Sequence, residues 1–209
     1  MTQKTAIFSL APISNFVFSN DPITYTAPSW ADLHQLAFIL ASQIQAKNLQ
    51  FDRLITLAKG GWPMACALTD LLQLKSVASV GVKFYAGVNQ KLSQPEMYQP
   101  LPISIAGERV LLFDDVADSG GSLEFVTNYL RTEGAAQITT ATLLTKPHSK
   151  IQPDFTAAVT SAWIVFPWEV VETVTTLTDQ WRRKGVASAE IRRRFLQLKL
   201  PIDWVTSLG

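Results

Sequence analysis

The chain has 209 residues, of which 47% are hydrophobic and 17% are charged, so it suits one compact domain with an appendage and is too apolar for a disordered protein. Eighteen basic and seventeen acidic side chains nearly cancel, which excludes a general electrostatic attraction to nucleic acid or to an anionic membrane. The single cysteine, Cys66, excludes an intrachain disulfide, and no run approaches the ~20 apolar residues of a membrane span, so we expect a cytoplasmic protein.

The N-terminal part of the chain predicts an irregular segment followed by a helix. Residues 1–28 contain three prolines and show no clear periodicity. Ser29, with Asp32 three residues later, is typical of a capping box at a helix start. The apolar side chains that follow have helical spacing and predict one buried face, formed by Leu33, Leu36, Ala37, Leu40 and Ile44.

Along most of the remaining chain, predicted strands alternate with predicted helices. Strands are predicted at residues 54–58, 77–85, 110–113, 139–144 and 157–165, and helices at residues 63–74, 121–130, 168–184 and 188–199. Residues 86–108 carry three prolines and little apolar periodicity, which predicts a long loop of the kind that often forms a lid. This order predicts an α/β fold with a mainly parallel sheet flanked by helices, in which ligands bind at the carboxyl ends of the strands.

The two C-terminal helices are separated by a short break. Gly185 is expected to end the first, and Ser188 to cap the second. The pair carries six basic residues, which are Arg182, Arg183, Lys184, Arg192, Arg193 and Arg194. A nucleic-acid patch is one interpretation, but a charge run is a weak motif, so a solvated helix face or a subunit contact is favoured.

Residues 110–122 carry most of the functional information. An apolar strand ends in two carboxylates, Asp114 and Asp115, and a short loop leads directly into a helix. Successive backbone N–H groups in such a loop, together with the positive end of the helix, form a site for a phosphate group. The two hydroxyls of the loop add donors, and its two glycines allow close approach to a ligand. The loop consists of Asp118, Ser119, Gly120, Gly121 and Ser122.

Two carboxylates beside a phosphate site indicate a ligand with further chemistry. A ribose 5-phosphate offers hydroxyls that donate to Asp114 and Asp115, and its sugar gains positive charge when the anomeric bond breaks. The alternatives are a strand end followed by an ordinary helix cap, or an acidic pocket that accepts a phosphoryl group. The second alternative needs no glycine-rich phosphate loop.

The 110–122 segment resembles the motif with which type I phosphoribosyltransferases bind phosphoribosyl pyrophosphate (PRPP). Other positions across residues 25–170 resemble the 6-oxopurine branch of that family, the xanthine–guanine–hypoxanthine enzymes. The resemblance implies transfer of 5-phosphoribosyl from PRPP to a purine base, giving a nucleoside 5′-monophosphate and pyrophosphate for purine salvage. It implies that residues 118–122, with Asp114 and Asp115, bind PRPP. Asp118 matches the candidate general base near N7 of the purine, with electrostatic positioning as its alternative role.

Two further segments resemble the parts of the family that handle pyrophosphate. Lys59-Gly60-Gly61 resembles the pyrophosphate loop, in which a cis peptide often turns backbone amides toward the leaving group; from residues alone it is a tight turn after a strand. Tyr85 resembles the start of the catalytic lid and would close over the pyrophosphate, keeping water from the reacting sugar.

Mg²⁺ is the cofactor that the resemblance implies. Magnesium prefers phosphates, waters and one or two carboxylates, so it would bridge the pyrophosphate and the ribose hydroxyls. Glu169, Asp114 and Asp115 are the carboxylates expected to face it. Many relatives have aspartate at the position of Glu169, so the contact of this longer side chain is left open.

The purine site is expected from two regions. Lys146 resembles the lysine that contacts the 6-oxygen, and an ammonium group, which only donates hydrogen bonds, favours a 6-oxo group over the 6-amino group of adenine. Residues 162–169 are similar to the base-binding end of the xanthine–guanine enzymes, which implies that Trp163 stacks on the purine and that Ile164 offers backbone groups to its 2-position edge. A solvated Lys146 and a core Trp163 are the alternatives.

Two other functions stay open. The same fold serves regulators that bind PRPP or nucleotides without catalysis, and a related enzyme would act on a pyrimidine or another base. The resemblance further implies a phosphoribosyltransferase domain with a base-binding hood at residues 1–169 and a C-terminal helical extension, residues 170–209, packed on the same domain. It also implies a homo-oligomer, either a dimer or a tetramer. The choice among guanine, xanthine and hypoxanthine is not readable from the sequence.

Overall fold

The computed structural model describes residues 13–87 and 90–203, without the side chains of residues 84–94. It divides into two compact units, one built from residues 34–160 and one from residues 1–33 with 161–209. These units are defined by how compactly their residues pack. The boundary after Glu169 that the sequence predicts is a different one, between a functional domain and a C-terminal extension, and it stays a prediction.

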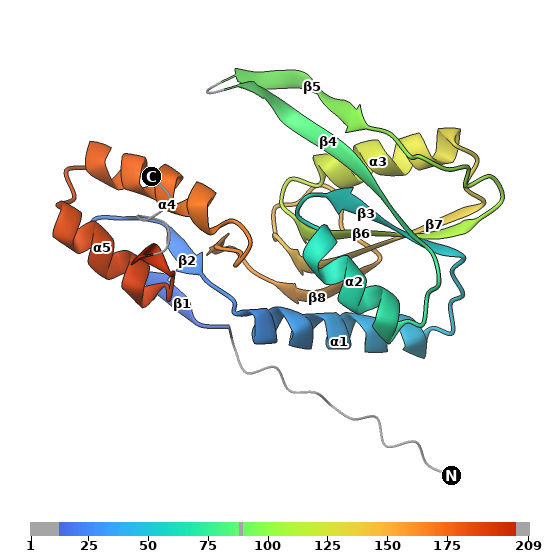
Figure 1. Ribbon diagram of the computed structural model, residues 1–209, viewed down its shortest axis with the longest axis horizontal. Helices are drawn as coiled ribbons and strands as arrows, with labels where there is room; N and C mark the ends of the chain where they lie inside the picture. The colour runs from blue at the N-terminus through green and yellow to red at the C-terminus, as the bar shows by residue number, and fades with distance from the viewer. Residues whose placement is uncertain (1–12, 88–89, 204–209) are drawn as a thin grey trace, which may run out of the picture. The chain divides into compact units, whose positions relative to one another are not determined.

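The larger unit contains a six-stranded sheet (Figure 1). Its strands lie in the order β5-β4-β3-β6-β7-β8, and every neighbouring pair is parallel except β4 and β5. This is the mainly parallel α/β fold that the sequence predicts. The strands are β3 (Arg53–Ala58), β4 (Val77–Gly87), β5 (Gln90–Gln99), β6 (Arg109–Ala117), β7 (Gln137–Thr145) and β8 (Phe155–Val159).

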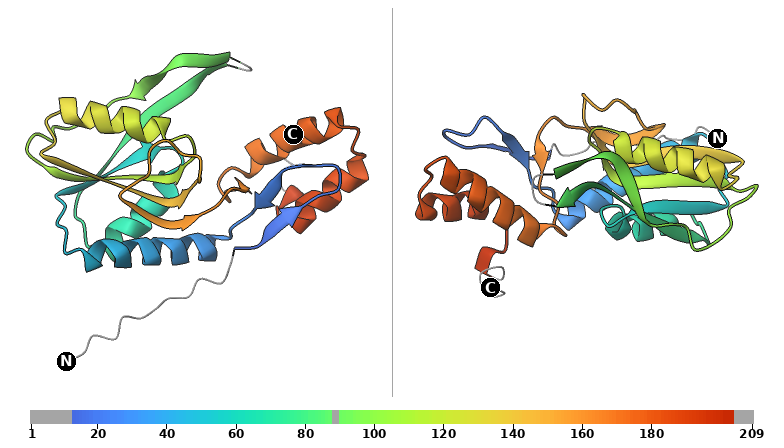
Figure 2. Two further views of the ribbon diagram at one scale, coloured as in Figure 1. Left: turned by 180° about the vertical axis from the view of Figure 1, so that it is seen from behind. Right: turned by 90° about the horizontal axis from the view of Figure 1, so that it is seen from above.

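Helices cover both faces of this sheet. α1 (Trp30–Ala46) and α2 (Trp62–Leu71) lie on one face, and α3 (Gly121–Thr132) lies on the other (Figures 1 and 2). On the α3 side, the helix buries three apolar side chains against sheet residues that include Ile55 and Leu112. Along these strands, side chains point alternately to the two covered faces, so the fully buried segments of β3 and β6 are apolar except for Thr56. In the part of the chain that the structure describes, every helix is too short or too polar to cross a membrane.

The start of α1 confirms the predicted capping box. The backbone N–H and the hydroxyl of Ser29 both donate to the Asp32 carboxylate, at 2.8 and 2.7 Å, and the Asp32 N–H donates back to the Ser29 hydroxyl. All five apolar positions predicted for this helix are buried. The reciprocal bonds satisfy N–H groups that have no partner inside the helix.

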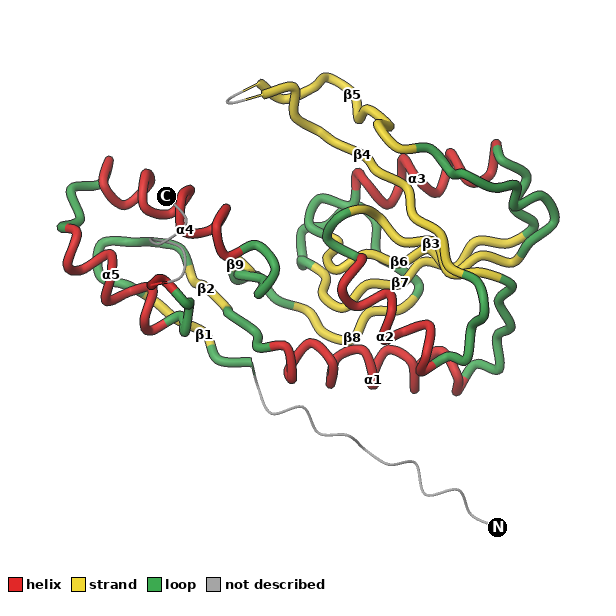
Figure 3. The backbone as a smooth tube through the Cα atoms, in the orientation of Figure 1, coloured by secondary structure: helices red, strands yellow, loops and turns green. Residues whose placement is uncertain are grey.

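The loop predicted at residues 86–108 is wrong in part, because Gln90–Gln99 form strand β5 antiparallel to β4 (Figure 3). Pro95 lies within this strand. Proline removes a backbone donor, but β5 is the edge of the sheet, where only one side of the strand needs partners. The sequence does not predict this strand, because the segment is polar and its prolines are typical of a loop.

The predictions for the two ends of the chain also need correction. Residues 1–28 are not irregular throughout, since they contain β1 (Asn15–Val17) and β2 (Thr24–Thr26). The strand predicted at residues 157–165 is two strands, β8 in the large sheet and β9 (Trp163–Ile164) in a second sheet of order β1-β2-β9. Strands of two or three residues carry no readable periodicity.

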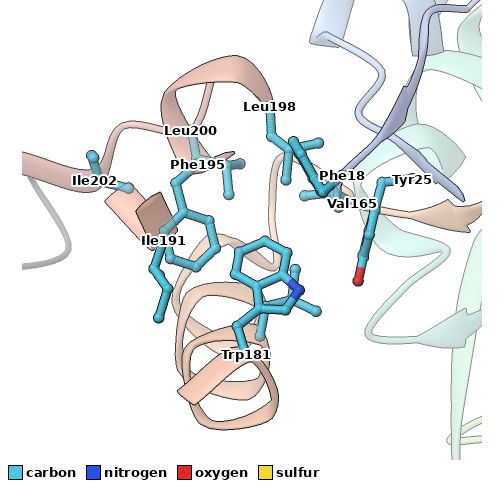
Figure 4. Close-up of a cluster of buried hydrophobic side chains, with 10 residues drawn as sticks. Phe18, Tyr25, Val165, Trp181, Ile191, Phe195, Leu198, Leu200 and Ile202 are labelled. Carbon is cyan, nitrogen blue, oxygen red and sulfur yellow. The ribbon is translucent and has the colours of Figure 1, made fainter. Parts of the chain in front are cut away.

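The smaller unit combines this second sheet with the two C-terminal helices, α4 (Val170–Arg183) and α5 (Ser188–Gln197). Gly185 ends the first helix with φ +76°, as predicted, whereas Ser188 is the first residue of α5 and Ala187 occupies the cap. The unit has its own aromatic core (Figure 4). Its large buried rings, which pack edge-on or tilted at 5.1–5.9 Å between centroids, belong to Phe18, Tyr25, Trp181 and Phe195.

A buried carboxylate, Asp21, links the N-terminal strands of this unit to α4. It accepts hydrogen bonds from the hydroxyl of Tyr25 at 2.7 Å and from the indole N–H of Trp181 at 2.6 Å. Lys184 donates to its other oxygen at 3.1 Å. Burial alone would raise the pKa of Asp21, but these hydrogen bonds together lower it below its ordinary value. The carboxylate is therefore stabilised in its charged form inside the unit.

Replacing this carboxylate tests its importance. Asp21→Asn is expected to lower the free energy of unfolding by about 2–4 kcal/mol at pH 7, because an amide cannot accept all these hydrogen bonds and leaves Lys184 without its anionic partner. Chemical denaturation followed by circular dichroism measures the change. Asp203→Asn is the control, since Asp203 forms an exposed ion pair with Arg192, and it should cost less than about 1 kcal/mol.

The same variant gives the sign of a pH effect. The lowered pKa means that the charge of Asp21 stabilises the fold fully when the pH is above the ordinary aspartate pKa near 4. This contribution is lost as the pH falls through the pKa of Asp21 in the folded protein. The difference in unfolding free energy between wild type and Asp21→Asn should shrink below about pH 4. A difference that stays constant down to pH 3 would show that the charge contributes nothing.

Candidate active site

The predicted phosphate loop lies between β6 and α3, in the strand–loop–helix arrangement expected from the sequence. Gly120 occupies the cap position of α3 and, having no side chain, makes no capping hydrogen bond to the first turn of the helix. The N–H of Gly121 donates only a long bond of 3.4 Å to the Ser119 hydroxyl. Backbone donors at the positive end of a helix, without a side-chain cap, form an anion site. Ser122 lies in this first turn, half-buried.

Glycine is required at position 120 for two reasons. Its φ of +83° lies in the left-handed region, which residues with a Cβ rarely adopt. A Cβ there would also lie 2.7 Å from the backbone nitrogen of Ile151 and 2.9 Å from the Ser149 hydroxyl. The absence of a side chain therefore lets the segment after β7 pack directly against the phosphate loop.

The two acids of the motif lie inside β6, which continues to Ala117 and is longer than the strand predicted at residues 110–113. Asp115 is buried and accepts a hydrogen bond from the Val116 N–H at 2.7 Å. Burial raises the pKa of Asp115 to about 6. Asp114 is partly exposed and accepts the Asp115 N–H at 3.0 Å. The pair thus combines one desolvated carboxylate with one that solvent reaches.

The Lys59-Gly60-Gly61 loop connects β3 to α2 beside these acids. The peptide bond between Ala58 and Lys59 is cis, as the resemblance implied. A Cβ at Gly60 would lie 2.6 Å from a carboxylate oxygen of Asp115, so the bare backbone of the loop packs onto that acid. Because β3 and β6 are neighbouring parallel strands, their carboxyl ends lie at one edge of the sheet.

Tyr98, a residue that sequence reasoning missed, contacts the same loop from β5. Its ring lies over Gly81, where a Cβ would collide with it, and its hydroxyl donates to the carbonyl oxygen of Ala58 at 3.3 Å. This contact depends on the β4–β5 pairing, which the sequence did not reveal. The backbone of Tyr85 pairs with Lys91 in that hairpin, but its side chain lies outside the described residues, so its contact with pyrophosphate stays a prediction.

Lys146 lies at the end of β7, next to the phosphate loop. Its backbone N–H donates to the carbonyl oxygen of Ala117 at 3.0 Å, and its side chain is buried. Burial lowers the pKa of Lys146, and the charge of Asp118 opposes that effect. A buried lysine beside a carboxylate is not the solvated strand-end lysine of the alternative interpretation.

His148 is a second residue that sequence reasoning missed. Its Nε2 atom lies 3.4 Å from a carboxylate oxygen of Asp118, and both side chains are exposed. The sequence offered no signal, because a lone histidine two residues after Lys146 matches no motif.

The expected base-binding residues Trp163 and Ile164 form β9 in the smaller unit. Trp163 pairs with Tyr25, and its side chain is 40% exposed, which argues against the alternative that it is a core residue. Ile164 is buried. Glu169 caps α4 through its backbone carbonyl, which accepts the Thr173 N–H at 2.8 Å. The structure describes these residues only within their own unit, so their approach to a purine stays a prediction.

A metal ion at this site would need ligands from a substrate or from water in addition to the carboxylates of the protein. Within residues 13–87 and 90–203, no group of three or more histidine, cysteine or acidic side chains is placed to hold an ion. Asp114 and Asp115 provide two carboxylates. This donor set fits Mg²⁺, which takes its remaining ligands from phosphates and water, and does not fit a structural zinc ion.

Comparisons with known proteins agree with this geometry. The family model described as "Phosphoribosyl transferase domain" matches residues 29–173. The xanthine-guanine phosphoribosyltransferase of Gluconobacter oxydans is 28% identical over 149 residues, which cover 70% of this chain and 86% of the relative. The purine phosphoribosyltransferase structure from Pyrococcus horikoshii has a TM-score of 0.62 and 31% identity, covering 69% of this chain and 93% of that one. A Neisseria gonorrhoeae protein with bound ppGpp has a TM-score of 0.61 and 25% identity, covering 69% and 89%.

Gly120 provides a test of the phosphate loop. Gly120→Ala is expected to weaken PRPP binding at least tenfold, because the methyl group forces the loop away from Ile151 in addition to straining the backbone by about 1–2 kcal/mol. Isothermal titration calorimetry measures the binding. Gly107→Ala is the matched control, since Gly107 has φ +79° with nothing within 4 Å of a Cβ. It should carry a similar strain and bind PRPP as wild type does; equal binding by both variants would contradict the role of the loop.

Proposed function

The chain belongs to the phosphoribosyl transferase family, and we propose that it transfers 5-phosphoribosyl from PRPP to a 6-oxopurine in purine salvage, releasing pyrophosphate. The observation that carries the proposal is the packing of Gly60 onto Asp115, beside the uncapped start of α3. A pyrophosphate loop, a sugar-binding acid and a phosphate site adjoin there. These are the three groups that an activated ribose 5-phosphate requires.

PRPP binding is assigned as follows. The backbone amides and hydroxyls of residues 119–122 hold the 5′-phosphate at the positive end of α3. Asp114 and Asp115 accept hydrogen bonds from the ribose 2′ and 3′ hydroxyls. When the anomeric bond breaks, the ring gains oxocarbenium character, and these fixed carboxylates stabilise its positive charge. A carboxylate that burial already desolvates interacts more strongly with that charge than an exposed one does.

Pyrophosphate is assigned to Lys59 and the backbone of Gly60 and Gly61, which face the departing group. Mg²⁺, when bound, neutralises the charge of the pyrophosphate and orients it. Asp114 and Asp115 would give the ion its carboxylate ligands, and Glu169 is a further candidate. The ammonium group of Lys59 places a further positive charge beside the leaving group.

The purine is assigned to Lys146, Trp163 and Ile164. The buried ammonium of Lys146 donates to the 6-oxygen, and a 6-amino group would leave it facing another donor. An unmatched donor at a desolvated site discriminates strongly between bases. Trp163 stacks on the ring, and the backbone at Ile164 meets its 2-position edge.

Asp118 is assigned as the general base. It takes or shares the proton on N7 of the purine while N9 attacks the anomeric carbon and the bond to pyrophosphate breaks. The proximity of Asp118 to Lys146 supports this assignment, because it places the carboxylate beside the residue that holds the 6-oxygen. Electrostatic positioning of the purine is its alternative role.

A second candidate function is regulation by nucleotide binding without turnover. The Neisseria gonorrhoeae structure contains ppGpp, a guanine nucleotide, on the same fold. A regulator needs the phosphate loop and the acids, but it does not need a general base beside a buried lysine. The retention of Asp118 and Lys146 in one place therefore favours transfer.

Three further proposals follow from the family. The protein is expected to be cytoplasmic and to form a homo-oligomer, either a dimer or a tetramer, and residues 170–209 are proposed to extend a transferase domain at residues 1–169. Light scattering measures the oligomeric state.

The proposed reaction is tested by supplying PRPP and Mg²⁺ with one base at a time. Guanine, xanthine or hypoxanthine should yield its nucleoside 5′-monophosphate and an equal amount of pyrophosphate, whereas adenine and pyrimidines should react at least about 100-fold less, given the discrimination that a buried unmatched donor provides. Chromatography of the nucleotide measures the outcome. Binding of PRPP without turnover of any base would favour the regulator, and turnover of orotate or uracil would favour the pyrimidine enzyme.

The general-base assignment is tested with Asp118→Asn. Removing a general base lowers turnover by about 10²–10⁴-fold, and PRPP binding should survive because the 5′-phosphate is assigned to residues 119–122 and the ribose hydroxyls to Asp114 and Asp115. Steady-state kinetics and calorimetry measure the two quantities. Unchanged turnover would remove Asp118 from the mechanism.

A further inference from the structure

Two backbone hydrogen bonds join the loop after β6 to the loop after β7. The Lys146 N–H donates to the carbonyl oxygen of Ala117 at 3.0 Å, and the Lys150 N–H donates to that of Ser119 at 3.1 Å. Asp118 lies between the two acceptor residues, and His148 is the middle one of the three residues between the two donors. The bonds therefore fix the two residues opposite each other, whatever their side chains contribute.

The His148 side of this arrangement is a rigid turn. The Ser149 N–H donates to the Lys146 carbonyl at 3.0 Å, and the Ser149 hydroxyl donates to the carbonyl of Ile151 at 2.8 Å. Gly120 packs against Ile151 without room for a methyl group. An exposed ion pair alone contributes little and does not order a loop, so the 3.4 Å approach of His148 to Asp118 is a consequence of this turn.

This approach of His148 occupies one carboxylate oxygen of Asp118 and leaves the other for the purine. His148 Nε2 lies nearest to Oδ1. An imidazole that carries its hydrogen on Nε2, neutral or protonated, donates to that oxygen after a closure of a few tenths of an ångström. The carboxylate is then held in one orientation, and its second oxygen is available to the N7 proton.

We propose that His148 is a positioning residue that orients the Asp118 carboxylate for proton transfer, an inference that rests on the proposed transfer to a purine. A general base acts only within hydrogen-bond reach of the proton it takes, and misplacement by about 1 Å costs up to 10²-fold in rate. His148 acts through Asp118 and contacts neither PRPP nor the base. Its contribution is therefore to kcat.

The experiment measures kcat and both KM values for His148→Ala, His148→Gln and the same changes in an Asp118→Asn background. His148→Ala should lower kcat about tenfold with both KM values within twofold of wild type. His148→Gln, whose amide N–H can donate to the carboxylate, should recover most of the loss. In the Asp118→Asn background, His148→Ala should have no further effect, because its partner is already absent.

The chain offers a matched control in its only other histidine, His34, which packs edge-on against Phe38 in α1. His34→Ala should leave all three constants unchanged. An unchanged kcat in His148→Ala, an equal loss in the Asp118→Asn background, or a rise confined to the KM of the base would each overturn the inference. A wild-type chain that makes no nucleotide would instead overturn the proposed function, and this inference with it.

Discussion

The close approach of backbone to side chain at Gly60 and Asp115 is the constraint on which the site depends. Parallel pairing of β3 with β6 brings their carboxyl ends to one edge, but the loop after β3 packs onto Asp115 of β6 only because Gly60 has no Cβ. Gly120 repeats the arrangement on the next pair, where the loop after β6 meets the segment after β7 at Ile151. Two glycine contacts thus join the loop after β3 to the end of β6, and the loop after β6 to the segment after β7, with the charged groups around them.

The parts of the site that are local in sequence were predictable. The phosphate loop follows a buried strand and precedes a helix, so the order of residue types at 110–122 was sufficient to predict its geometry. The contacts of Tyr98 and His148 were not predictable. Tyr98 reaches Ala58 through the β4–β5 register, and His148 reaches Asp118 through bonds between two loops. Such contacts depend on pairing across the sheet, which no short motif encodes.

The fold shows the same division. The strongly periodic α1 was predicted with its cap and its buried face, because capping and burial each leave a signal in the sequence. Strands β1, β2 and β9 have two or three residues and form only through their neighbours, so periodicity does not detect them. Strand β5 is polar and contains Pro95, which an edge position tolerates and a central position would not.

The C-terminal helices give the short strands of the smaller unit their stability. Trp163 pairs with Tyr25, and the hydroxyl of Tyr25 donates to Asp21, which also accepts the indole N–H of Trp181 in α4. The guanidinium carbon of Arg194 in α5 lies over the rings of Phe18 and Trp181, 5.1 Å from each centroid. A sheet of such short strands is marginal without a packed face. The strand that carries Trp163 is therefore held by residues beyond position 173, outside the segment that the family model matches.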